Sequence, residues 1–200
     1  MTTQRIDGCN SLSLPKGVFK DIFERAKPYL MVRENDVHTL IAYSLAVKLL
    51  EGAKVDERVV LAAVILHDTG YSELTAEEMS QSLMADPEGN VFRIKHEEEG
   101  ARIAAKILDE LGFGDQEVKH VSKIINGHDS RMTSISSEDE IVKDADKLYR
   151  FTSTGVDFMR RWAGMEPSTC LKWLKGKIEP WFFTERAKEM AAALIDEAEG

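Results

Sequence analysis

The chain has 200 residues, of which 43% are hydrophobic and 30% are charged, and its formal net charge is −9. This length and apolar fraction suit one domain with a sizeable core and exclude a disordered chain. The acidic balance argues against a nucleic-acid polymer as partner, because binding such a polymer requires Lys and Arg side chains that neutralise its phosphates. A small phosphorylated ligand held in a metal-charged pocket stays compatible with this charge.

The cysteines and the beginning of the chain exclude further classes of protein. Cys9 and Cys170 lie far apart and belong to no motif, so they offer neither a disulfide framework nor a thiolate metal site. Residues 1–10 lack the apolar stretch of a signal peptide, and no apolar run approaches the roughly 20 residues of a membrane span. We therefore expect a cytoplasmic protein that has no membrane partner.

Two helices are predicted in the first fifty residues. Residues 18–29 have amphipathic spacing, and this helix is expected to end near Pro28, because proline cannot continue the hydrogen-bond ladder. Asn35 or Asp36 can cap a second helix that runs to about residue 50. Its apolar residues recur at i, i+3, i+4 and i+7, and His38 falls in that series. His38 is therefore expected on the core face.

The chain is organised around the run 59–66, which is apolar throughout and ends in His67 and Asp68. A surface helix would show a polar face, so this segment is expected to be buried. We predict a helix that runs through Asp68, because Asp56 can cap its start and Gly70 can end it as a C′ residue. Ionisable groups at the end of a buried helix must be paired, neutral or bound to a metal.

The rest of the chain also reads as helical. A polar connection of residues 71–94 comes first, with a turn at 86–90 and a short helix over 75–84, and a connection of this length is often a lid or binding loop. Further helices are expected over about 95–111, 116–126, 137–150 and 184–197. Pro167 and Pro180 mark breaks near the C-terminus, where the Trp and Phe residues are read as core. No strand alternation is convincing, so the predicted fold class is all-α.

Four of the five histidines fall on or beside the core faces of different predicted helices: His38, His67, His96 and His128. Carboxylates accompany them at Asp68 and at the pair Asp144 and Asp146. The gaps between these residues each correspond to about one helix and a connection, so consecutive helices could present ligands to one centre. A lone buried histidine is more often a hydrogen-bonded core residue, but four together favour a metal site. Imidazole and carboxylate suit Fe, Mn, Co, Ni or Zn better than Ca or Mg.

Two other polar residues are left out of this set. His120 lies eight residues before His128 and points away from it on an ideal helix, so it is not counted as a ligand. Asp129 forms a second His-Asp pair, but it follows a weaker apolar run and is not counted either.

The order His38 … His67-Asp68 … Asp146 resembles the HD-domain superfamily of metal-dependent phosphohydrolases, whose pattern is H…HD…D. Leu-His-Asp-Thr-Gly-Tyr at 66–71 and Asp-Ala-Asp-Lys-Leu at 144–148 are similar to two signatures of that family. The resemblance covers about residues 30–152. It implies a single HD-type helical domain over 1–200, a helical bundle in which helices of 153–200 pack on the ligand-bearing core.

The resemblance also implies the ligands. His38, His67, Asp68 and Asp146 would hold a first divalent transition metal, with Asp144 as the reserve choice for the last position. His96 and His128 would complete a second site, as in family members that hold two metals, so one or two ions are expected. Asp68 would also orient the attacking water, which makes Asp68 and His67 the expected catalytic residues.

The implied substrate is a small phosphomonoester or phosphodiester, such as a nucleotide or a related metabolite, cleaved by a metal-activated water. Three cations are candidates for its phosphate: Arg33, Lys95 and Lys147. The run Glu97–Glu99 is read as a solvated first helical turn. Two alternatives stay open: an HD-type di-iron oxygenase, and a non-catalytic nucleotide- or metal-binding module. The sequence does not set the oligomeric state, for which a homodimer is one option.

Overall fold

The computed structural model describes residues 12–82 and 90–199. In chain order its elements are α1 (Val18–Leu30), α2 (Asn35–Leu49), α3 (Glu57–Leu66), the 3₁₀-helix η1 (Thr69–Glu73), α4 (Ala76–Ser82), α5 (Val91–Glu110), α6 (Asp115–Ile125), α7 (Ser137–Tyr149), α8 (Ser153–Ala163), α9 (Pro167–Lys175), α10 (Ile178–Trp181) and α11 (Glu185–Glu199). Every regular element in the described ranges is a helix, which confirms the all-α prediction. None of these helices combines the length and apolar character that a membrane crossing requires.

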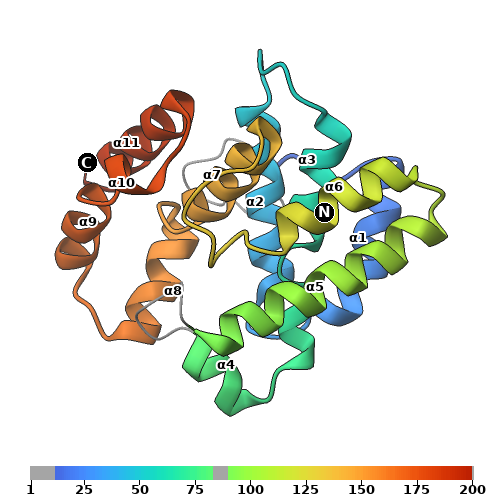
Figure 1. The fold of residues 1–200 in the computed structure, drawn as a ribbon. Coiled ribbons are helices and arrows are strands. Elements are labelled where there is room, and N and C mark those ends of the chain that lie inside the picture. Colours follow the sequence, from blue (N-terminus) through green and yellow to red (C-terminus); the bar gives the residue numbers. More distant parts are fainter. Residues whose placement is uncertain (1–11, 83–89, 200) are drawn as a thin grey trace, which may run out of the picture.

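The helices pack around α3. Figure 1 shows α2 beside α7, α5 beside α6, and the C-terminal helices α9 to α11 beyond α7. Helix α3 packs against α1, α2, α5, α6 and α7, and all of its residues 59–66 are at most 2% exposed. The carboxylate of Asp56 accepts hydrogen bonds from the main-chain nitrogens of Arg58 and Val59, so it caps the helix as predicted. The apolar run is therefore the buried helix that the sequence indicated.

The segment after α3 differs from the prediction. The helix ends at Leu66, His67 follows as its C-terminal cap, and η1 begins directly after Asp68. Gly70 is not in the left-handed region, so it does not end the helix in the way that the sequence suggested. Instead a Cβ at this position would overlap the carbonyl oxygen of His96 and the nitrogen of Gly100. Gly70 thus lets η1 approach α5 backbone to backbone.

Helix α1 ends near Pro28, as predicted, whereas the predicted cap of α2 is wrong. Pro28 lies inside α1, because it and Glu24 are exposed and water can bond the Glu24 carbonyl that loses its intrahelical partner. The N-terminal cap of α2 is Glu34 rather than Asn35 or Asp36. Arg33 and Glu34 both have positive φ, at 56° and 59°, which is a costly conformation for residues other than glycine. The turn between α1 and α2 is therefore strained.

The connection before α5 contains η1 and α4, in line with the short helix expected there, and most of the predicted turn at 86–90 lies outside the described residues. Helix α5 begins at Val91, earlier than predicted, because the side chain of Asn90 accepts hydrogen bonds from two main-chain nitrogens of the first turn. Glu97 therefore lies in the second turn of α5.

The C-terminal part holds four helices, of which only the last had predicted bounds, at about 184–197. Pro167 begins α9, as a predicted break would allow, but Pro180 lies within α10. Phe182 is buried, whereas Trp173 is 39% exposed, so the aromatic residues are only partly core. Helix α11 packs against α7 and thereby joins this part to the helix that carries Asp146.

Candidate metal centre

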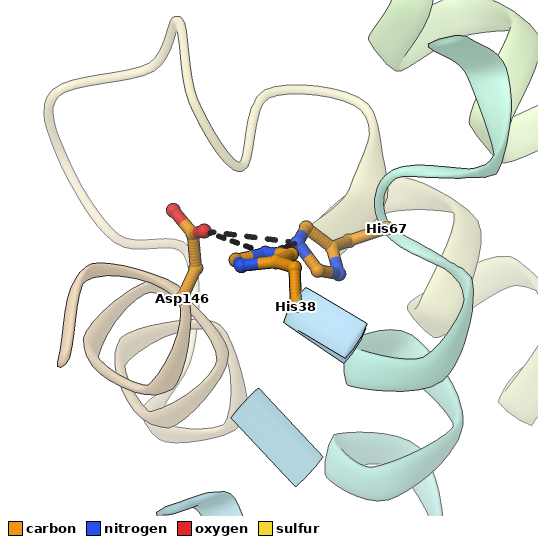
Figure 2. A group of neighbouring side chains, drawn as sticks. All are labelled: His38, His67 and Asp146. Carbon is orange, nitrogen blue, oxygen red and sulfur yellow. Dashed lines mark hydrogen bonds and ion pairs between the residues drawn. The ribbon is translucent and has the colours of Figure 1, made fainter. Parts of the chain in front are cut away.

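Three side chains from three helices converge at the middle of the fold. Figure 2 shows His38 from α2, His67 from the end of α3 and Asp146 from α7 pointing toward one another. The Nε2 atoms of the two histidines are 3.0 Å apart, and Oδ1 of Asp146 lies 3.3 Å from Nε2 of His38 and 3.7 Å from Nε2 of His67. All three residues are buried. The arrangement places one potential ligand atom of each residue around a common point.

Main-chain carbonyls fix the orientation of two imidazoles. Nδ1 of His67 lies 2.8 Å from the carbonyl oxygen of Val64, and Nδ1 of His128 lies 2.9 Å from that of Ile125. A carbonyl can only accept, so Nδ1 carries the hydrogen in both rings. Nε2 then holds the lone pair in the neutral form and faces the cluster, which is the tautomer that metal-binding histidines commonly adopt.

Asp68 links these residues to a second group. Its Oδ1 lies 3.5 Å from Nε2 of His67 and 3.6 Å from Nε2 of His128, and its Oδ2 lies 3.5 Å from Nε2 of His38. Potential ligand atoms of His67, Asp68 and His128 therefore form a second close group, which shares His67 with the first. A carboxylate in this position could contribute a ligand atom to either group.

His96 lies next to the second group but is not a member of either close group. It is fully buried, its ring stacks on that of Tyr71 at 4.1 Å between centroids, and it meets His128 edge-on at 5.2 Å. Neither ring nitrogen of His96 has a hydrogen-bond partner among the described residues. Burial lowers the pKa of His96 to about 4, so the ring is neutral at pH 7. A buried neutral imidazole with free lone-pair capacity is costly unless it serves as a ligand.

The charges of the centre depend on one another. Burial opposes ionisation of Asp68 and Asp146, yet neighbouring histidines, and for Asp146 also Arg150, hold the pKa of each carboxyl well below its usual range. Burial likewise opposes protonation of His128, but Asp68 and Glu97 raise its pKa to about 9. The centre thus pairs ionised carboxylates with imidazolium, and a divalent cation could replace those protons. The donor set of imidazole and carboxylate fits a transition metal.

The two candidate aspartates of α7 are separated by the structure. Asp144 accepts hydrogen bonds from the main-chain nitrogens of Phe183 and Thr184, each at 2.9 Å, and from Oγ1 of Thr184 at 2.7 Å. These bonds hold Asp144 at the start of α11, away from the histidines. Asp146 joins the cluster instead, as the preferred sequence assignment had it.

The three candidate phosphate ligands have different surroundings. The guanidinium of Arg33 lies 4.4 Å from the ring centroid of Tyr71, which in turn stacks on His96. Nζ of Lys95 pairs with Glu78 of α4 at 2.8 Å. Nζ of Lys147 donates to the last carbonyl of α10 at 3.2 Å. Of the three, Arg33 contacts a ring that forms part of the centre's surroundings.

Glu97 was misread from the sequence as a solvated residue. It is 1% exposed, and its carboxylate accepts hydrogen bonds from the main-chain nitrogens of Asp129 and Ser130 and from the hydroxyl of Ser130. The spacing held a signal for this, because Ala104 and Leu108 follow Glu97 at i+7 and i+11 and are fully buried. The prediction failed because the helix was expected to begin at residue 95 instead of 91.

Two residues beside the first group were not singled out by the sequence. Nη1 of Arg150 lies 3.2 Å from Oδ2 of Asp146, and the ring of Tyr149 meets that of His38 edge-on at 4.4 Å. The signal for Arg150 is its i, i+4 spacing from Asp146 on α7, which is typical of a helical ion pair. Arg150 therefore fixes the outer oxygen of a candidate ligand.

The residues left out of the predicted ligand set have other partners. Nε2 of His120 lies 3.1 Å from Oγ of Ser136, outside both close groups. Oδ2 of Asp129 forms an ion pair with Nη1 of Arg93 at 2.7 Å.

Comparison with known proteins gives the family. The family model of the HD domain matches residues 35–150, which is more than half of the chain. The chain belongs to the HD domain family. The match begins at the first residue of α2 and ends directly after α7, so it contains both close groups and His96, whereas helices α8 to α11 lie outside it.

Two crystal structures share the fold of this HD domain. One is a predicted HD superfamily hydrolase from an uncultured Thermotogales bacterium, with a TM-score of 0.59, 22% sequence identity and coverage of 88% of this chain and 84% of the other. The second is an HD-superfamily hydrolase from Bacillus thuringiensis, with a TM-score of 0.59, 20% identity and coverage of 90% and 92%. No curated protein matches this chain. At these identities the likeness concerns the fold.

Proposed function

We propose that this HD domain is a metal-dependent phosphohydrolase that cleaves a small phosphomonoester or phosphodiester, such as a nucleotide or a related metabolite. The observation that carries the proposal is the buried convergence of His38 from α2, His67 and Asp68 from the end of α3, and Asp146 from α7, with Asp68 in contact with His38 and His67. The membership of the HD family and the names of the two structural neighbours support hydrolysis as the reaction class.

Each residue has a role that follows from its position. His38, His67 and Asp146 would hold the first ion, and Asp68 lies where it can contact both groups. When bound, a divalent ion of Fe, Mn, Co, Ni or Zn would acidify a water and supply hydroxide near neutral pH. An ionised Asp68 can accept a hydrogen bond from that water and so orient it toward the phosphorus atom. His96 and His128 would complete the second site.

The residues around the centre could bind the negatively charged oxygens of a phosphate. Arg33 is the cation that contacts Tyr71, and Arg guanidinium groups bind phosphate oxygens through paired N–H donors. Burial and the nearby carboxylates of Asp68 and Asp129 raise the pKa of Tyr71 well above its usual value. Its hydroxyl therefore stays protonated and able to donate. Lys95 and Lys147 remain weaker candidates, since each has a partner elsewhere.

The first test is metal content together with turnover. Protein purified without chelator should contain one or two transition-metal ions per chain and should hydrolyse members of a panel of phosphomonoesters and nucleotides. His67→Ala and Asp68→Ala should lose that activity while keeping the helical circular dichroism of the parent. His120→Ala is the matched control, because His120 lies outside the centre, and it should keep both metal and activity.

The opposite results would replace the proposal. Unchanged turnover in both variants would remove His67 and Asp68 from the active site. Oxygen consumption by iron-loaded protein without phosphoester hydrolysis would favour an HD-type oxygenase. Tight nucleotide binding without either activity would favour a binding module.

A further inference from the structure

The backbone that carries His128 is held by two buried charged side chains from different helices. Residues 127–131, here termed the His128 segment, follow α6 and form no regular helix of their own. Glu97 of α5 and Lys143 of α7 contact this segment from separate elements, and both are 1% exposed. Neither contributes an atom to the two close groups of potential ligands.

The carboxylate of Glu97 accepts hydrogen bonds from one side of the His128 segment. Its Oε1 lies 2.7 Å from the main-chain nitrogens of both Asp129 and Ser130, and its Oε2 accepts from the hydroxyl of Ser130. Three donors to one buried carboxylate form a charge-assisted set of hydrogen bonds, which are about twice as strong as neutral ones. Because Glu97 directly follows His96, the same turn of α5 carries one candidate ligand and holds the backbone next to another.

The ammonium group of Lys143 donates hydrogen bonds to main-chain carbonyls of the same segment. Its Nζ lies 2.6 Å from the carbonyl oxygen of Gly127, 2.9 Å from that of His128 and 2.8 Å from that of Arg131. An ammonium group has three hydrogens to donate, so the three carbonyls use its full capacity. The buried charge is thus bonded only to the main chain of the His128 segment among the described residues.

The two side chains hold the same peptide group. The peptide between His128 and Asp129 presents its carbonyl oxygen to Lys143 and its N–H to Glu97. The cation meets the negative end of this dipole and the carboxylate meets the positive end, so both interactions are favourable. A peptide plane fixed at both ends sets ψ of His128, and with the Nδ1 bond to Ile125 it leaves the ring little freedom.

We propose that Glu97 and Lys143 are positioning residues that aim Nε2 of His128 at Asp68 and set its spacing from His96, and so determine whether the second metal site forms. The inference rests on the proposed function, because it assigns His96 and His128 to a second ion. Of the first group, His67 meets the ring of His128 edge-on at 5.0 Å, whereas His38 and Asp146 are grouped with His67 and not with His128. The first ion should therefore be less sensitive to Glu97 than the second.

The experiment compares Glu97→Gln with Glu98→Gln. The two positions are neighbours and undergo the same chemical change, but Glu98 is exposed. Metal binding is measured by titration and by metal analysis of the dialysed protein. Glu97→Gln should lower the affinity for the second ion by about 10–100-fold, the usual effect of removing a group that orients a ligand. The affinity for the first ion should stay within about twofold of the parent value. Glu98→Gln should bind both ions as the parent does.

A second readout does not depend on metal. The imidazole ¹⁵N spectrum of the metal-free protein contains signals from only five histidines, and those of His128 are assigned with His128→Gln. Glu97→Gln should shift or broaden the His128 signals and leave those of His38 in place. Ser130→Ala removes a single bond to Glu97 and should give a smaller shift, which covers the case in which Glu97→Gln does not fold.

The outcomes separate the two proposals. A parent protein that binds no metal defeats the proposed function, and the His128 spectrum still decides the role of Glu97. Unchanged metal binding and unchanged His128 signals in Glu97→Gln would overturn the inference. Loss of both ions in parallel with a general loss of structure, together with a normal spectrum in Ser130→Ala, would also overturn it, because Glu97 would then support the fold as a whole.

Discussion

At the scale of single residues, Asp144 and Asp146 stand two positions apart on α7 and do different work. Asp144 accepts three hydrogen bonds at the start of α11, whereas Asp146 faces two histidines. We expect Asp144→Asn to lower the free energy of unfolding by about 1–3 kcal/mol, because an amide NH₂ would face buried donors. Asp146→Asn should reduce metal binding, whereas Asp144→Asn should leave it intact. Urea unfolding and metal analysis of both variants test this, and equal metal loss in the two would contradict it.

Metal affinity should depend on pH through His128. The pKa of His128 is raised to about 9 in the metal-free protein, so the ring carries a proton at pH 7 that a metal must displace. Affinity should therefore increase as pH rises from 6 toward 9 and level off above it. His96, with a pKa of about 4, contributes no proton in this range. Calorimetry in buffers of different ionisation enthalpy counts the protons released, and an affinity independent of pH would exclude His128 as a ligand.

The sequence supplied the residues that meet at the centre but not the residues that hold them. His38, His67, His96, His128 and Asp68 could be selected because an ionisable group on an apolar helical face is unusual and shows in the spacing. Glu97 and Lys143 were not selected, because their partners lie on backbone 12 to 33 residues away. Such contacts depend on how helices pack, which no local pattern records.

At the scale of elements, the contact between η1 and α5 depends on Gly70. A Cβ there would overlap main-chain atoms of α5, which cannot rotate aside as a side chain can. We expect Gly70→Ala to destabilise the fold by about 1–3 kcal/mol, the usual cost of overpacking. Gly176→Ala is the matched control: Gly176 has φ of −72° and its added Cβ would have only ordinary contacts. Thermal unfolding compares the two, and equal stability would show that η1 can move without cost.

Helix positions were predicted better than helix ends. The buried helix α3 follows from its apolar run and its Asp56 cap, both of which are local. The role of Gly70 was missed, because a close approach between two backbones leaves no signal at the glycine other than the glycine itself. Helices were expected within 153–200, but the bounds of α8 and α9 were not predicted, although Thr152 caps the first and Pro167 begins the second.

At the scale of the whole molecule, the helices after the HD match are tied to its core. Nζ of Lys147 in α7 donates to the carbonyl of Trp181 in α10 at 3.2 Å, and Arg186 of α11 donates to the carbonyl of Lys48 near the end of α2. Asp144 takes its three donors from Phe183 and Thr184, directly before α11. These contacts agree with the expected single domain over 1–200, which stays a prediction.

A chain ending at residue 152 tests that prediction. It would leave the buried carboxylate of Asp144 without its donors and would expose Phe151, which is 1% exposed in the full chain. We expect the shortened chain to unfold at lower temperature, with a broader transition than the full chain. Circular dichroism and calorimetry during heating provide the measurement. A sharp transition at the original temperature would show that the core folds alone and that α8 to α11 are an addition to it.

The glycine contact between η1 and α5 has a consequence for how this protein can change over generations. Gly70 faces the carbonyl of His96, and Gly100 faces the carbonyl of His67, so main-chain atoms set the distance between two segments that carry candidate ligands. The apolar residues of α3 can then be exchanged for others of similar volume without altering that distance. Mutational drift in the core and preservation of the centre are therefore compatible, as long as neither glycine acquires a side chain.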